Sequence, residues 1–242
     1  MTKLTCGEIL DDKGNPIPGT GFEYESDGRV AELLAQRITP VLYSPPQGEW
    51  AWMIPDESNG KNERGVAVSP AGNKGPLVHY HPSFDEHFKA AAGTWVLKAD
   101  SEEVTLTAGE DLYVKSGVVH TFRCVGEEGD FGVMEFDVLP AVGFGDMLKA
   151  AFGQAHDYNL NPSKDQPPLI QTFVSLRGFQ TKKGLGYMDL AVMVPPGKTV
   201  QTIFNILSIF ISPIGRLLGY KPDYPNHHDD EFWEKRVNQP SK

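Results

Sequence analysis

Cysteine is scarce in this chain of 242 residues, which contains only Cys6 and Cys124. Two cysteines are too few for a disulfide framework or for a thiolate cluster that binds zinc. Positive charge is also scarce, because the net charge is −10 and there is no basic footprint for phosphates. These shortages argue against a disulfide-stabilised scaffold and against a nucleic-acid-binding protein.

The start of the chain, Met-Thr-Lys-Leu-Thr-Cys, lacks the apolar core of a secretory signal. Together with the scarcity of cysteine, this predicts an intracellular, cytoplasmic protein in reducing surroundings. The hydrophobic fraction of 40% is enough for a sizeable core. We therefore expect a globular protein.

The most informative stretch contains three histidines and a glutamate. His79 and His81 are two residues apart, so on a strand they would project from the same face. Glu86 follows after a short turn, and His120 would come from a separate strand. Three imidazole nitrogens and one carboxylate oxygen suit a divalent first-row metal. We predict one such ion per chain, with iron preferred and manganese, nickel, zinc or copper as alternatives.

The spacing of these residues resembles the two motifs of the cupin superfamily. The residues that match are His79, His81, Glu86 and Gly93 in the first motif and Gly109, Gly117 and His120 in the second. Three positions depart from the family pattern. Lys115 replaces a proline, Cys124 replaces an asparagine, and Gly75 precedes His79 by three intervening residues instead of five. None of the three is a ligand in the family, so the resemblance still implies the metal site.

The resemblance implies a mainly β fold, a cupin jelly-roll barrel, followed by a C-terminal α-helical extension. The resemblance also includes the local sequence at residues 85–88, 93–95 and 218–220. Cupins of this kind occur in bacteria and fungi, and some belong to secondary metabolism, among genes for small aromatic or polyketide products. We divide the chain into an N-terminal arm (1–29), the barrel (30–140) and the extension (141–242).

Local patterns support this division. Short runs of strand-forming residues separated by glycines and acidic residues indicate a sandwich or barrel between residues 77 and 140. A strand is also predicted at 49–54, and residues 30–37 have a short helical pattern. After Pro140 the period becomes helical, with helices predicted at 146–156 and 169–176. Residues 187–194 fit either a helix or a strand.

Strand parity predicts the lining of a substrate pocket. Phe88 should share the inward face with Glu86, and Phe122 and Cys124 should share it with His120. Cys124 is expected to be a small buried hydrophobe. Trp52 has two interpretations, packing on one barrel face, which we favour, or a wall for a flat substrate. Apolar walls around a metal are typical of small-molecule sites.

A long apolar stretch at residues 199–220 predicts an amphipathic helix. Its main apolar face includes Ile203, Leu207, Phe210 and Ile214. We expect this face to pack on the barrel, with a second apolar patch covered by another helix or subunit. A membrane span is disfavoured because polar residues interrupt the stretch. Contact with a membrane interface remains an alternative.

Three classes of function fit these observations. The first, which we prefer, is an oxidoreductase, a dioxygenase that acts on a small organic substrate. The second is a non-redox isomerase, decarboxylase or cyclase in which the metal is a Lewis acid. The third is a binding protein without catalysis. The ligand set alone does not separate the first two, and a homodimer is left open.

Overall fold

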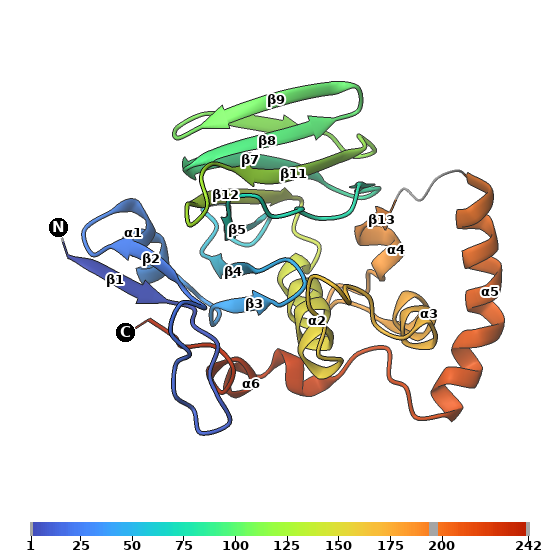
Figure 1. The fold of residues 1–242 in the computed structure, drawn as a ribbon. Helices are drawn as coiled ribbons and strands as arrows, with labels where there is room; N and C mark the ends of the chain where they lie inside the picture. The colour runs from blue at the N-terminus through green and yellow to red at the C-terminus, as the bar shows by residue number, and fades with distance from the viewer. Residues whose placement is uncertain (1, 194–197, 241–242) are drawn as a thin grey trace.

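Two antiparallel sheets form the centre of the computed structural model, which describes residues 2–193 and 198–240 (Figure 1). The larger sheet has the order β10-β7-β12-β5-β4-β3, and the smaller has the order β13-β6-β11-β8-β9. Their strands are β3 Leu42–Ser44, β4 Glu49–Ile54, β5 Glu63–Pro70, β6 His79–Tyr80, β7 Asp85–Ala92, β8 Thr94–Ala99, β9 Glu102–Thr107, β10 Asp111–Val114, β11 His120–Val125, β12 Phe131–Leu139 and β13 Val192–Met193. The jelly-roll class predicted from the sequence is confirmed.

The main hydrophobic core lies between the two sheets. Side chains alternate along each strand, so one set from each sheet faces inward. The inward set includes Phe88, Trp95, Met134 and Phe136, which are all buried in one cluster. Residues of the helical extension pack against the same cluster, among them Leu190. The extension therefore contributes to the core of the barrel.

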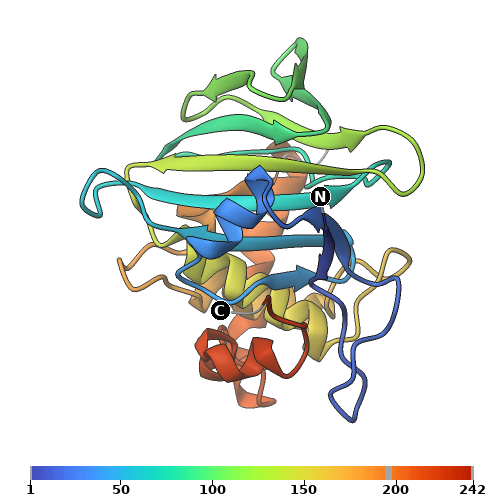
Figure 2. The ribbon, with the colours of Figure 1, turned by 90° about the vertical axis from the view of Figure 1, so that its left-hand side faces the viewer.

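A second core covers the outer face of the larger sheet. Trp50 and Trp52 of β4 lie there, against helix α1 (Arg29–Ala35) and the arm strands β1 (Lys3–Cys6) and β2 (Phe22–Glu25). Figure 2 shows these arm elements in front of the larger sheet. The indole N–H of Trp52 donates to the carbonyl of Leu33 at 3.1 Å. The pocket-wall interpretation of Trp52 is therefore wrong, and the packing interpretation holds.

The extension is helical, as predicted. It contains α2 (Phe144–Asp157), α3 (Leu169–Gly178), α4 (Tyr187–Leu190), α5 (Lys198–Leu217), a short 3-10 helix (Pro225–His228) and α6 (Asp230–Glu234). The segment that fits either a helix or a strand contains both, because α4 is followed by β13; its last residue, 194, lies outside the described residues. The end of the chain returns to the arm, where the amide of Asn238 donates to the carbonyl of Glu8 at 2.7 Å.

Helix α5 forms where the apolar period predicts a helix, but the prediction of its packing is wrong. Its buried positions are Ser208, Ser212 and Gly215, which face α3. Most of the described apolar side chains point to solvent. Small residues allow a close approach of two helix backbones, and the period of apolar residues does not reveal this. Of the helices that the structure describes, none is long and apolar enough to cross a membrane.

Candidate metal centre

Strands of both sheets bring the predicted metal ligands together. His79 in β6 pairs directly with His120 in β11, and Glu86 lies in β7 of the other sheet. His81 directly follows the end of β6. All four side chains are buried, with exposed fractions of 3–7%. One ligand atom from each residue lies within 4.8 Å of the others.

Backbone carbonyl groups orient the three imidazole rings. Nδ1 of His79 donates to the carbonyl of Leu77 at 2.6 Å, and Nδ1 of His120 donates to that of Val118 at 3.0 Å. Nδ1 of His81 donates to the carbonyl of Leu190. A proton held on Nδ1 leaves the lone pair on Nε2 free, which is the tautomer that binds a metal.

The atoms at the centre of the group lack suitable partners. Nε2 of His81 and Nε2 of His120 each lie 2.9 Å from Oε2 of Glu86. These contacts are close but poorly aligned, and within the described part of the chain none of the three atoms makes a hydrogen bond of good geometry. Leaving buried polar atoms unpaired is costly. A divalent cation would satisfy all of them, so the residues fit a metal.

At Glu86 and His79, electrostatics favour the protonation states that a metal requires. Burial alone would raise the pKa of Glu86, but the adjacent His81 and His120 imidazoles outweigh it and lower that pKa to about 2. Burial, together with the neighbouring His120 and His81, lowers the pKa of His79 to about 4. Burial also opposes protonation of His120, yet Glu86 raises its pKa. Glu86 is thus ionised and His79 neutral at pH 7.

Phenyl rings surround the imidazoles. Phe84 stacks on His81 with ring centroids 4.2 Å apart, and Phe144 meets the same ring edge-on at 6.3 Å. Phe88 lies 6.1 Å from the ring of His120. The structure therefore places the predicted Phe88 beside the site and adds two phenylalanines that the sequence analysis did not identify.

The other predicted pocket residues lie farther from the metal ligands. The ring of Phe122 packs on that of Phe88 with centroids 5.3 Å apart, so Phe88 lies between Phe122 and the ring of His120. Cys124 pairs with Trp95 at the far end of β11, where it is buried as a small hydrophobe. Trp52 is on the outer face of the sheet, as described above. Phe84 lies between the ligands His81 and Glu86 in the sequence, and that position could have identified it. Phe144 begins α2, far from the ligands in the sequence, so no sequence pattern indicates its place beside them.

A segment of the extension covers the centre. Strand β13 pairs with β6, so that Met193 is opposite His79 and Val192 is opposite Tyr80. The hydroxyl of Ser83 donates to the carbonyl of Asp189 at 2.6 Å. With the bond from His81 to the carbonyl of Leu190, these contacts close the barrel beside the ligands and limit the access of water.

Comparisons with known proteins agree with this architecture. The family model described as a cupin domain matches residues 65–136, which include all four candidate ligands. No protein with a curated description matches the chain.

Three solved structures are similar to part of the chain. An RmlC-like cupin from Shewanella frigidimarina is 21% identical, with 43% of this chain and 86% of that chain covered and a TM-score of 0.36. KdgF from Halomonas sp. is 13% identical, with coverage of 44% and 91% and a TM-score of 0.38. A cupin-like protein from Thermotoga maritima is 18% identical, with coverage of 38% and 68% and a TM-score of 0.31.

Proposed function

The chain belongs to the cupin superfamily, and we propose that it is a metal-dependent oxidoreductase of the dioxygenase type. Its substrate would be a small organic molecule with an apolar body, such as an aromatic or polyketide-derived compound. One observation carries the proposal: three imidazole nitrogens and one carboxylate oxygen converge, buried and without good partners, among phenyl rings.

The residues of this chain would hold and orient the metal. His79, His81 and His120 offer Nε2, and Glu86 offers a carboxylate oxygen. The carbonyl groups that accept from Nδ1 fix the rings before the metal arrives, which reduces the cost of ordering them. When bound, a first-row metal such as iron supplies one-electron chemistry with O₂, which closed-shell side chains lack.

The phenyl rings would select the substrate. Phe84, Phe88 and Phe144 form an apolar wall beside the imidazoles and exclude water from them. An apolar wall binds an aromatic ring by burial and by edge-to-face contacts. A non-redox isomerase or decarboxylase moves protons at its substrate and commonly uses an acid or base for that step. The rings of Phe84, Phe88 and Phe144 beside the imidazoles neither donate nor accept a proton, and this wall supports the redox class.

Oxygen consumption tests the proposal. Protein loaded anaerobically with Fe(II) would be mixed with small aromatic candidates, and O₂ uptake and product would be measured together. We expect O₂ uptake only with a substrate present, in proportion to product. Equal turnover without O₂ would assign the protein to the Lewis-acid class. Binding of the candidates without any turnover would indicate the third class, a binding protein.

Two variants sharpen this test. Phe88→Ala removes a phenyl ring from the wall beside His120 and so leaves more room for a substrate. It should change the preference among substrates while the metal content stays constant. Tyr24→Ala is a control on the outer face of the larger sheet, where that ring packs in the second core. It should leave the preference unchanged.

A further inference from the structure

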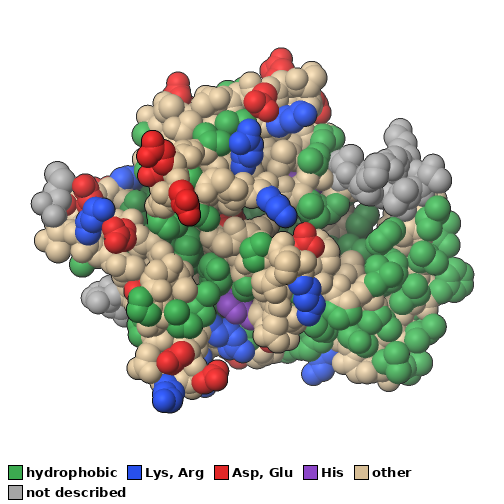
Figure 3. All heavy atoms as spheres, viewed as in Figure 1, with side chains coloured by type: hydrophobic (Ala, Val, Ile, Leu, Met, Phe, Trp, Pro, Cys, Tyr) green, Lys and Arg blue, Asp and Glu red, His purple; other side chains and the backbone are tan. Residues whose placement is uncertain are grey.

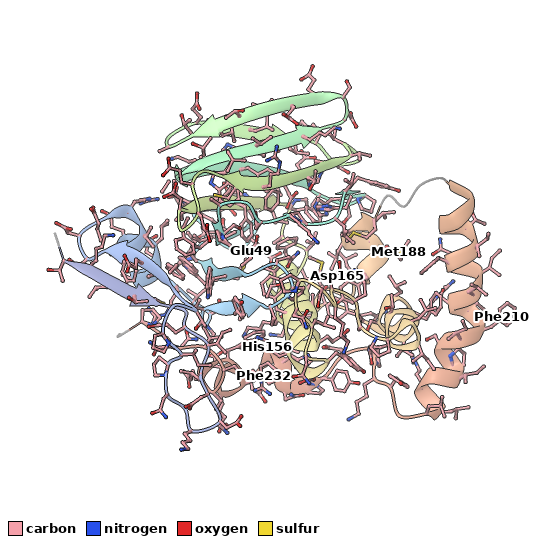
Figure 4. The ribbon with its side chains drawn as sticks, in the orientation of Figure 1. Glu49, His156, Asp165, Met188, Phe210 and Phe232 are labelled. Carbon is pink, nitrogen blue, oxygen red and sulfur yellow. The ribbon has the colours of Figure 1, made fainter. Side chains whose placement is uncertain are left out.

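Helix α5 presents an exposed apolar surface at the edge of the molecule. This α5 surface consists of Ile203, Phe204, Ile206, Leu207, Ile209, Phe210, Ile214, Leu217 and Leu218, with exposed fractions from 38% to 88%. Figure 3 shows hydrophobic side chains covering the right-hand edge, and Figure 4 shows Phe210 pointing outward from α5. Such contiguous exposed patches mark interaction sites.

The other side of α5 is fixed to the protein. Nε of Arg177 donates to Oγ of Ser208 at 2.7 Å, and a side chain at Gly215 would clash with Val174 of α3. A surface helix normally turns its apolar side inward. Here the small side is held against α3, so the apolar side stays outward.

The width of the α5 surface favours an extended apolar medium over a single partner helix as its occupant. With about 100° of rotation per residue, the exposed apolar positions from Ile209 round to Leu207 span roughly 160° of the helix. Phe204 lies at the border of this arc, where its ring also meets Phe173 of α3 with centroids 5.3 Å apart. One partner helix covers a stripe only about 100° wide. A second copy of the chain would therefore leave much of the surface in water, whereas the acyl region of a bilayer would surround it.

Charge distinguishes this segment from the rest of the chain. There is no acidic residue between Asp189 and Asp223, but there are three basic residues, Lys198, Arg216 and Lys221. The whole chain has a net charge of −10, so its acidic residues lie elsewhere in the sequence. A segment without acidic groups and with a basic residue near each end is complementary to anionic headgroups.

We propose that the α5 surface docks the protein onto an anionic lipid bilayer. The helix lies in the interface, with its apolar arc among the upper acyl chains and its small side on α3. It stands at the outer edge of the fold in Figure 1, with α3 and α4 on its inner side, so a flat surface can approach it. The contact is one-sided, because no described helix can span the bilayer. This proposal is independent of the enzymatic function.

Vesicle binding tests it on the full-length protein. Sedimentation would use vesicles of phosphatidylcholine alone and vesicles with phosphatidylglycerol added. We expect binding to both, stronger with the anionic lipid. Ile206→Glu/Phe210→Glu should weaken binding by at least about tenfold, since it removes two large apolar groups and adds repulsion. Ile17→Glu/Ile38→Glu changes two exposed apolar residues of the arm and α1 region and should bind like wild type.

The location of contact can be read from a single new tryptophan. The native tryptophans Trp50, Trp52, Trp95 and Trp233 are all at most 4% exposed. Brominated lipids should therefore quench Phe210→Trp strongly and the wild type little. Absence of vesicle binding would overturn the proposal. If light scattering then showed a dimer that Ile206→Glu/Phe210→Glu dissociates, the occupant would be a second copy of the chain instead.

Discussion

At the scale of single residues, His156 shows how burial sets a protonation state. Its Nε2 donates to the carbonyl of Tyr43 at 3.0 Å, and its ring packs against Phe232 and Trp233. Figure 4 shows His156 and Phe232 in the same region, below the sheets. Burial lowers the pKa of His156 to about 4, so the ring is neutral in the folded protein at pH 7.

This shift predicts a loss of stability in mild acid. The unfolded chain binds a proton at His156 near pH 6.5, whereas the folded protein binds it only near pH 4. The unfolded state therefore holds more protons in this window, and the free energy of unfolding falls as the pH falls from about 6.5 to about 4.

Urea unfolding at pH 7 and pH 5 measures the effect. Wild type should lose on the order of 2 kcal/mol more than His156→Gln over this interval. Glutamine can still donate to the carbonyl of Tyr43, so the difference between the two proteins reports the effect of protonating His156 on stability. Equal losses in the two proteins would show that His156 does not titrate as its burial implies.

Residue patterns predicted which side chains share a face better than they predicted which face is inside. Alternation along β4 puts Trp50 and Trp52 on one face, and both lie in the second core. It does not say whether that group faces the barrel interior, because both faces of the larger sheet are covered by apolar groups. Phe88 could be placed because a metal ligand, Glu86, shares its face. Trp52 had no such neighbour in sequence.

At the scale of elements, the start of α2 depends on a distant carboxylate. Oε2 of Glu63 accepts from the amides of Val142, Gly143 and Phe144 at 2.8, 2.7 and 3.0 Å. Amides at a helix start have no partner within the helix, and a carboxylate there also interacts favourably with the helix dipole. This cap holds Phe144 where it meets His81.

Glu63→Ala should therefore destabilise the protein by about 1–3 kcal/mol, because several amides lose their acceptor. Thermal or urea unfolding measures the change. Glu57→Ala is the matched control, since Glu57 lies in the loop that leads into β5 and its side chain is 94% exposed. It should change stability by less than about 0.5 kcal/mol. Equal effects of the two substitutions would argue against the cap.

The helices of the extension could be located from sequence, but their partners could not. A period of 3.6 reports that a segment has an apolar side, and it located α2, α3 and α5. It does not report what that side contacts. In α5 the buried positions that face α3 are Ser208, Ser212 and Gly215, which the period treats as the polar side. Phe204, at the border of the apolar side, also meets Phe173 of α3. The position of such a helix depends on how closely two backbones approach, which the apolar period does not report.

At the scale of the whole molecule, the barrel and its centre were predictable because the spacing of the ligands and glycines resembles the two cupin motifs. The structure shows why that spacing is informative, since it brings His79, Glu86 and His120 together from three strands. The cover over the centre was not predictable, because Leu190 supplies a backbone carbonyl to His81 from a segment 109 residues away. Every residue has a backbone carbonyl group, so the residue type does not indicate which one accepts a hydrogen bond.

The most direct test of the account is the metal content of protein purified without chelators or metal-affinity resin. We expect about one divalent first-row ion per chain in the wild type, and almost none in His81→Ala/His120→Ala. His87→Ala is the control, since His87 neighbours Glu86 but contacts Asp111 on the outer side; it should keep the full content. Circular dichroism would confirm that each variant is folded. Full metal retention by the double variant, or a folded wild type that binds no divalent ion, would contradict the account.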